Sequence, residues 1–233
     1  MAVSIDTVYQ RVLVLANKEQ RGYITPQEFN LYANQAQMDI FEQYFHDMSQ
    51  FRRINGNDTE HSDSVDIIEE KISLFERTTS VTAMDNKVDI SNIQDLYRLG
   101  NIYYNSNICE KVSNKNIIAI NNSPLLKPLK SRPVYTISGN NIVLYPIDIY
   151  YGEVSFDYIK KPSNVRWGYV ISSTGNALYN DDINHTKDFE LHISEETKLV
   201  IKILALAGFT LKDPGLYTAA TGEDNRNIQQ EKQ

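Results

Sequence analysis

The sequence is poor in several residue types that specific chemistry requires. It contains one cysteine, Cys109, so the chain cannot form an internal disulfide, which is typical of a protein assembled in a reducing compartment. Its 10 glycines are scattered and none precedes a Lys-Ser or Lys-Thr pair, which excludes a phosphate-binding loop of the known kind. The net charge of -7 excludes a general attraction to nucleic acid, so any contact with DNA must be local.

Long apolar runs are also missing. Near the N-terminus, Gln10, Arg11 and Asn17 interrupt the apolar residues, and no basic segment precedes them. Signal peptides and membrane-spanning helices both need an uninterrupted apolar stretch. We therefore expect neither of them, and we expect assembly in the cytoplasm with no membrane partner.

Metal-ligand spacing is equally hard to find. The four histidines occupy separate segments, and none has a second ligand at a helical or CxxC spacing. The best candidate for a metal site is the acidic loop with Asp181, Asp182, His185 and Asp188. Because such loops are far more often solvated, we expect no metal and no cofactor.

An enzyme active site has one weak candidate. A nuclease needs two acids and a lysine on adjacent strands, and Asp148, Asp157 and Lys160 imitate that set loosely, without the usual acid-x-Lys spacing. Alternation along a strand places Glu153 and Asp157 on one face, which we assign to solvent. We expect no catalytic residue, and a nuclease or processing enzyme is the alternative from a different class.

The N-terminal third has the periodicity of helices. Apolar residues recur at helical spacing from Ser4 to Ala16, and Thr25, Pro26 and Glu28 form a capping box that begins a helix reaching Met48. A polar loop over 55–64 and a helix over 65–77 follow. The apolar stripe of the second helix is too wide for one partner, which predicts packing between subunits through Phe29, Tyr32, Ile40, Phe41, Tyr44 and Phe45.

The middle of the chain has the pattern of strands, expected over 88–90, 97–104, 117–120 and 152–159. A hairpin is predicted from 134–137 and 142–145, because Gly139 and two asparagines between them tolerate positive φ. Ser194 begins a last helix that ends near Gly208. These elements predict an α+β fold with a small, mainly antiparallel sheet, divided into a helical region 1–77, a β-rich region 78–193, a helix 194–211 and a polar arm 212–233.

Two surface features suggest partners. Residues 111–132 form a local basic patch that either faces passing phosphates in a channel or keeps a sheet edge solvated: Lys111, Lys115, Lys127, Lys130 and Arg132. The polar arm has too little apolar surface to order alone, so it either stays mobile or orders on a partner through Leu216, Tyr217, Arg226 and Ile228. The 15 tyrosines also suit subunit interfaces.

Three stretches carry a resemblance to a known group of proteins. ANKEQRGYITPQEFNLYANQAQMDIFEQYF, PVYTISGNNIVLYP with the later YIKKP, and ISEETKLVIKILALAGFTLKDPGLY through QQEKQ resemble structural proteins of tailed bacteriophages, especially the crAss-like phages. The resemblance covers about two thirds of the chain, and its motifs are distinctive in combination.

Members of this group resemble the head-to-tail connector, or neck ring, proteins of short-tailed phages. That resemblance implies a virion protein in the neck or tail region, assembled in the host cytoplasm. Its partners are implied to be further copies in a ring of twelve, the portal protein, other neck or tail rings, and packaged DNA through non-specific contact. A tail, baseplate or minor capsid component is the alternative within the structural class, and a monomeric binding module is a third possibility.

Overall fold

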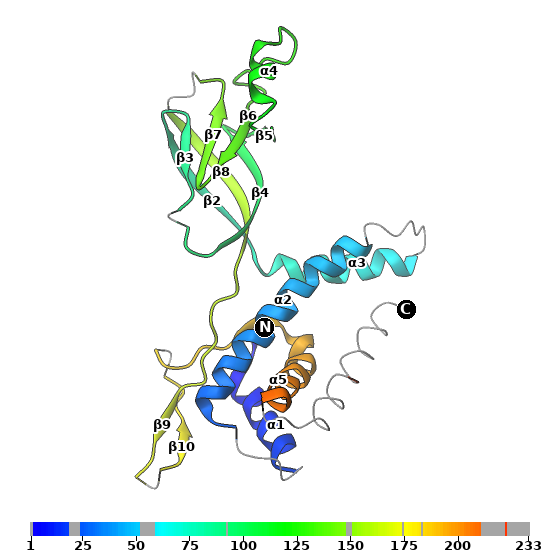
Figure 1. Cartoon of the computed structure of the whole chain (residues 1–233), viewed down its shortest axis with the longest axis vertical. Helices are drawn as coiled ribbons and strands as arrows, with labels where there is room; N and C mark the ends of the chain where they lie inside the picture. Colours follow the sequence, from blue (N-terminus) through cyan, green and yellow to red (C-terminus); the bar gives the residue numbers. More distant parts are fainter. Residues whose placement is uncertain are drawn as a thin grey trace. The chain divides into compact units, whose positions relative to one another are not determined.

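The computed structural model describes residues 2–18, 24–51, 59–91, 93–147, 151–173, 175–182, 184–210 and 222. These residues form two compact units (Figure 1). Unit 1 comprises Met1–Leu74 and Pro162–Gln233, and unit 2 comprises Phe75–Lys161. Unit 2 is therefore an insertion into unit 1, and the chain enters and leaves it at two positions.

Unit 1 is built on helices α1 (Ile5–Lys18), α2 (Pro26–Phe51), α3 (Thr59–Ser73) and α5 (Glu196–Thr210), with a short 3-10 helix, η1 (Ile193–Glu195), before the last. Helix α2 packs against α3 and α5, and α1 packs against α5. The four predicted helices are present, but the predicted end of the third near residue 77 is wrong, because α3 ends at Ser73 and strand β2 (Glu76–Met84) follows. The third helix begins at Thr59, inside the predicted loop. The prediction missed this start because residues 59–64 lack the apolar residues that reveal helical periodicity. Fully buried side chains of this unit include Ile5, Val8, Val12, Phe29, Ile40, Phe41, Phe189, Leu191, Leu199 and Ile203.

The predicted capping box at the start of α2 is present. The Thr25 N–H donates to Glu28 Oε2 at 2.9 Å, and the Glu28 N–H donates to Thr25 Oγ1 at 3.3 Å. The hydrogen bonds from Thr25, the side-chain bond first, lower the pKa of the Glu28 carboxyl. Helix α1 also receives a cap from a distant residue, because the Ile5 N–H donates to Asp188 Oδ1 at 2.8 Å.

Unit 1 also holds two small antiparallel pairs of strands. Strand β1 (Ala2–Val3) pairs with β11 (Phe189–His192), which brings the start of the chain to the start of α5. Strand β9 (Tyr169–Ile171) pairs with β10 (Ala177–Tyr179) in a hairpin. Among the described strands, neither β9 nor β10 has a further neighbour.

Unit 2 is a closed barrel of seven strands, in the order β2 (Glu76–Met84), β3 (Lys87–Asp89), β7 (Asn141–Tyr145), β6 (Val134–Ser138), β5 (Asn107–Lys111), β4 (Leu96–Tyr104) and β8 (Tyr151–Lys160). Its pairs are antiparallel except for β5 with β6. Its core contains Ala83, Val88, Ile102, Tyr104, Cys109, Tyr135, Ile142, Leu144, Val154 and Phe156. Burial of the thiol raises the pKa of Cys109 to about 11.

The barrel corrects two predictions. The chain is α+β, but its main sheet is closed instead of small and open, because β2 pairs with β8 along its whole length from Glu76 to Met84. Strand β2 was not predicted because its sequence, ERTTSVTAM, has few apolar residues. The strand predicted over 117–120 is wrong, since helix α4 (Ile117–Asn122) occupies these residues. The predicted hairpin of β6 and β7 is confirmed.

The boundary of the β-rich region also differs from the expected one. Residues 162–193 belong to unit 1 with the helices, while the barrel ends at Lys161. The reason is a set of side-chain contacts from α2, which hold this segment against the helical unit.

Candidate interaction surfaces

Three amide side chains of α2 bind the segment that follows the barrel. Asn30, Asn34 and Gln37 lie on one face of the helix, because they are four and three residues apart. Asn34 accepts from the Val165 N–H at 2.8 Å and donates to the Val165 carbonyl at 2.9 Å. Asn30 bonds the N–H and the carbonyl of Trp167 in the same way, at 2.7 and 3.3 Å. The helix thereby satisfies an extended backbone as a neighbouring strand would.

Gln37 extends this ladder of amides. Its Nε2 donates to the Ser163 carbonyl at 2.9 Å, and its Oε1 accepts from the Glu190 N–H at 3.1 Å. The side chain is buried, so these bonds are made away from water. None of these three residues was predicted from the sequence. Their helical spacing within the apolar stripe of α2 could have indicated that their amides are buried and hydrogen-bonded.

Trp167 fixes the base of the β9–β10 hairpin. Its ring lies 4.2 Å from the Tyr9 ring of α1 and stacks on Tyr169 and Tyr179 at 5.9 and 5.8 Å between centroids. Its indole N–H donates to Asp6 Oδ1 at 2.9 Å. The base of the hairpin is therefore attached to α1 on both of its strands.

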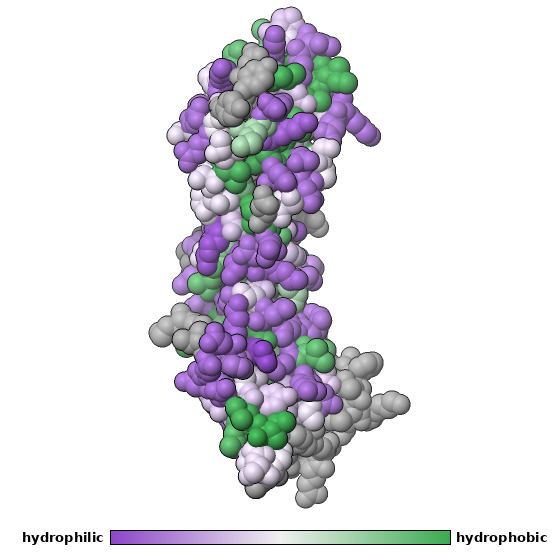
Figure 2. All heavy atoms as spheres, turned by 90° about the vertical axis from the view of Figure 1, so that its left-hand side faces the viewer, coloured by the Kyte–Doolittle hydropathy of each residue, from purple (hydrophilic) through white to green (hydrophobic). Residues whose placement is uncertain are grey.

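Beyond this base, the hairpin surface exposes apolar side chains on both faces. Val170 lies opposite Leu178, and both are more than half exposed. On the other face, Ile171 lies opposite Ala177 and is 67 % exposed. Figure 2 looks onto this hairpin and shows hydrophobic side chains gathered over it, in the lower part of the view. We call these residues the hairpin surface.

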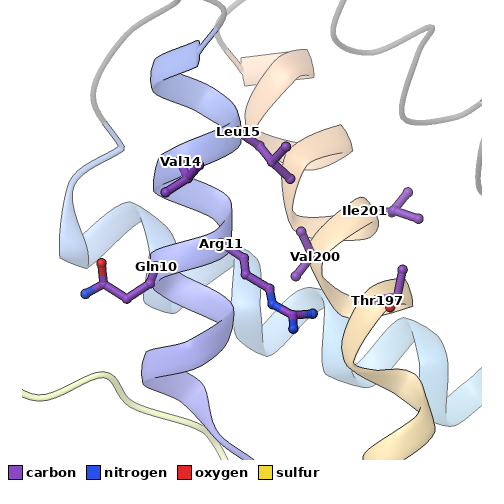
Figure 3. Close-up of a pocket in the computed structure, with 7 residues that line it drawn as sticks. All are labelled: Gln10, Arg11, Val14, Leu15, Thr197, Val200 and Ile201. Carbon is purple, nitrogen blue, oxygen red and sulfur yellow. The ribbon is translucent and has the colours of Figure 1, made fainter.

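A groove lies between α1 and α5, with a volume of about 460 Å³. It is lined by Gln10, Arg11, Val14, Leu15, Thr197, Val200 and Ile201. Figure 3 shows that α1 supplies one wall and α5 the other. Among the described residues of the lining, Arg11 alone is charged, and its guanidinium lies 2.9 Å from the Glu196 carboxylate. The side chain of Val14 is 63 % exposed, so this wall is apolar and open.

The predicted basic patch lies on unit 2, at and beyond the end of β5. All five cations are exposed: Lys111, Lys115, Lys127, Lys130 and Arg132. Arg132 approaches Glu110 at 3.7 Å. We call residues 112–133, between β5 and β6, the tip segment. It also exposes Ile118, Leu126, Leu129 and Leu125, the last to 91 %. The leucines were not part of the sequence prediction.

The residues predicted to pack between subunits divide into two groups. Phe29, Ile40, Phe41 and Tyr44 are buried within their own chain. Tyr32 and Phe45 are half-buried. The wide stripe of α2 is therefore covered largely by α3, α5 and the segment 163–167. The predicted residues of the arm, Leu216, Tyr217, Arg226 and Ile228, lie outside the described residues.

The two weak candidates for chemistry have these surroundings. In the acidic loop, His185 Nδ1 lies 3.1 Å from Asp182 Oδ2, and hydrogen bonds from Asn184 and His185 lower the pKa of Asp182. Within the described ranges, no group of three His, Cys, Asp or Glu side chains is placed to hold a metal ion.

In the barrel, Asp157 accepts hydrogen bonds from Thr78 at 2.8 Å and Tyr103 at 3.2 Å. Asp148, the second acid of the proposed nuclease set, lies outside the described residues. The carboxylate of Asp157 thus has a structural role in joining β8 to β2 and β4.

No family model matches the chain, and no curated protein matches it. Across the part of the chain that the structure describes, no helix has the length and apolar character that crossing a membrane requires.

Proposed function

We propose that this chain is a structural virion protein of a tailed phage, a subunit of the connector ring that joins the portal to the tail around the DNA channel. The phage assignment rests on the resemblance of the sequence. The observation that carries the assembly role is the apolar surface left open on unit 1, at the hairpin surface and at the groove between α1 and α5. Exposed apolar surface of this kind favours association.

The mechanism we propose is geometric. Each copy contacts two neighbours through two different surfaces, and a fixed rotation between copies closes the ring. In a closed ring, each copy is held by two neighbours, so a contact that breaks forms again before the copy can leave. The assembled ring is therefore much more stable than a single pair of copies. A closed ring then seals packaged DNA and presents one end to the portal and the other to the tail.

The tip segment is the part that we propose for contacts beyond the ring. Its four exposed cations, together with Lys111 at the end of β5, provide a local attraction to phosphates in an otherwise acidic chain. Its exposed leucines, Leu125 above all, favour a protein surface instead of an aqueous channel. We therefore propose that the leucines contact a neighbouring virion protein and that the lysines lie beside the DNA path.

The test is the mass of the purified protein in solution across a range of concentrations, alone and with portal protein, followed by imaging of any large species. We expect a closed ring, formed either by the chain alone or when portal protein is added. A stable monomer that ignores portal and the other virion proteins contradicts the proposal. Stoichiometry within the virion separates a connector from a tail, baseplate or minor capsid component.

A further inference from the structure

We infer that the β9–β10 hairpin of one copy docks into the groove between α1 and α5 of the next copy. This inference rests on the proposed ring and names its contact. The hairpin is a two-stranded sheet whose outer edges are unpaired among the described strands. An isolated hairpin of this size is marginally stable in water, and an open apolar edge invites pairing. A surface that covers the face formed by Val170 and Leu178 removes both problems, and Ile171 on the other face then lies at the rim of the contact.

The charges of the two surfaces match. No charged residue occurs from Trp167 to Asn180, so the hairpin surface is neutral, and exposed Asp181 and Asp182 follow directly at its base. The groove is neutral apart from Arg11 at its edge, whose side chain is 53 % exposed. A neutral apolar hairpin thus meets a neutral apolar groove, and Arg11 at the rim is neutralised by Glu196 of its own chain, so no net charge opposes the contact.

The size of the groove also suits this occupant. Its volume of about 460 Å³ lies in the range of pockets that hold whole small ligands, roughly 300–1,000 Å³. That space accommodates several aliphatic side chains from one face of a hairpin. The half-exposed Leu15 and the exposed Val14 on the wall of α1 gain the burial that their own chain does not give them.

The two surfaces point in different directions, which makes the contact intermolecular. The base of the hairpin is fixed to Tyr9 of α1 through Trp167. At about 100° per residue around a helix, Arg11 and Val14 lie roughly 140–200° from Tyr9. The groove therefore opens on the face of α1 opposite to the hairpin, so the hairpin cannot reach the groove of its own chain. Two different surfaces on opposite faces are the requirement of a head-to-tail contact.

The experiment uses two full-length variants, Ile171→Cys on the hairpin and Val14→Cys in the groove, mixed and treated with a short bis-maleimide. Both positions are exposed, and buried Cys109 with its raised pKa reacts slowly. We expect a cross-linked heterodimer of one variant with the other, at least tenfold above the product of either variant alone. Because each chain carries one reactive cysteine besides buried Cys109, the product cannot extend beyond this dimer, and its mass identifies the contact.

A second variant measures the energy of the contact. Val170→Ser with Leu178→Ser removes apolar surface at two exposed positions, so the fold is retained, and the fluorescence of Trp167 at the hairpin base verifies this. We expect the concentration at half-assembly to rise at least tenfold. Ile67→Ser, which removes an apolar side chain of α3 that is 53 % exposed and belongs to neither surface, is the matched control and leaves that concentration unchanged.

The outcomes separate this inference from the proposed ring. Rings that form normally without the heterodimer, and with no response to the serine variant, overturn the inference and leave the ring standing. A heterodimer within open filaments supports the inference and contradicts the closed ring, while a monomer without any cross-link overturns both. An intramolecular product from Val14→Cys with Leu216→Cys assigns the groove to the chain's own C-terminal residues and also overturns the inference.

Discussion

Replacing Asn34 by alanine tests whether the amide ladder of α2 holds the segment that carries the hairpin. The side chain makes two bonds to one residue, accepting from the Val165 N–H and donating to its carbonyl. Val165 is buried, so water does not replace these bonds easily. Asn34→Ala leaves both backbone groups without their present partner.

The expected magnitude follows from these two groups. A buried polar group left unsatisfied costs about 1–3 kcal/mol. Alanine recovers up to about 0.7 kcal/mol through its higher helix propensity. The net loss in the free energy of unfolding of unit 1 is therefore about 3 kcal/mol, within about 1–5 kcal/mol. Asn34→Asp keeps the acceptor but loses the donor, and it places a carboxylate against the Val165 carbonyl, so we expect it to destabilise as well.

The chain provides one probe for each unit. Trp167, the single tryptophan, reports unit 1 by fluorescence, and Cys109, the single cysteine, reports unit 2 by thiol labelling. For a urea dependence of about 1–3 kcal/mol per molar, a loss of about 3 kcal/mol lowers the Trp167 midpoint by roughly 1–3 M. Gln35→Ala, at an exposed position of the same helix, is the control and changes stability by less than about 0.5 kcal/mol.

Two results would refute the reasoning. One is an unchanged Trp167 midpoint in Asn34→Ala. The other is an equal loss of protection at Cys109, which would mean that the substitution acts on both units and not on the ladder. Complete unfolding of unit 1 with Cys109 still protected would agree with the upper end of the estimate.

Two further predictions use other contacts of the same chain. Thiol reagents at pH 8 should label Cys109 far more slowly in the native protein than in the unfolded chain, and equal rates would contradict its burial. Because burial raises the pKa of Cys109 to about 11, the stability that this thiol contributes is complete below pH 9 and is lost as the pH rises toward 11. In the native protein, the largely buried Lys71 ammonium lies 2.7 Å from the Glu195 carboxylate. Glu195→Ala leaves this ammonium unpaired, so it should destabilise unit 1 by about 3–5 kcal/mol in urea unfolding. The adjacent Glu196→Ala removes a half-buried carboxylate whose partner Arg11 is 53 % exposed, and it should change stability by less than about 1 kcal/mol. Equal effects of the two substitutions would contradict the prediction.

The helices were the most predictable part of the fold. The capping box at Thr25 and Glu28 is encoded within four residues, and amphipathic spacing extends over several turns of α1 and α5. The hairpin of β6 and β7 is local for the same reason, since its turn uses the positive φ of Gly139. Local signals of this kind are visible in a sequence because all the interacting residues lie close together in it.

Closure of the barrel was not predictable from these local signals. It depends on the pairing of β2 with β8, strands far apart in sequence. In β2, the residues that face inward are Thr79, Val81 and Ala83, and these small or polar side chains give the sequence a weak apolar alternation. The division into units was unpredictable for the same reason. It depends on contacts such as that of Asn34 with Val165, which lie 131 residues apart. The basic residues of the tip segment were identified from charge, whereas the exposure of Leu125 followed only from its place in the structure.

The arrangement of contacts assigns separate roles to the two units. The hairpin surface and the groove both belong to unit 1, so the proposed ring contact needs no residue of the barrel. The barrel joins unit 1 through two chain segments that pair with each other, since Glu76 lies opposite Ile159 and the Lys160 N–H donates to the Phe75 carbonyl at 2.8 Å. The barrel has a core of its own, and its tip segment belongs to a different unit from the proposed ring contact. In the proposed connector, unit 1 would therefore make the contacts among copies, and the barrel would make the contacts with other molecules.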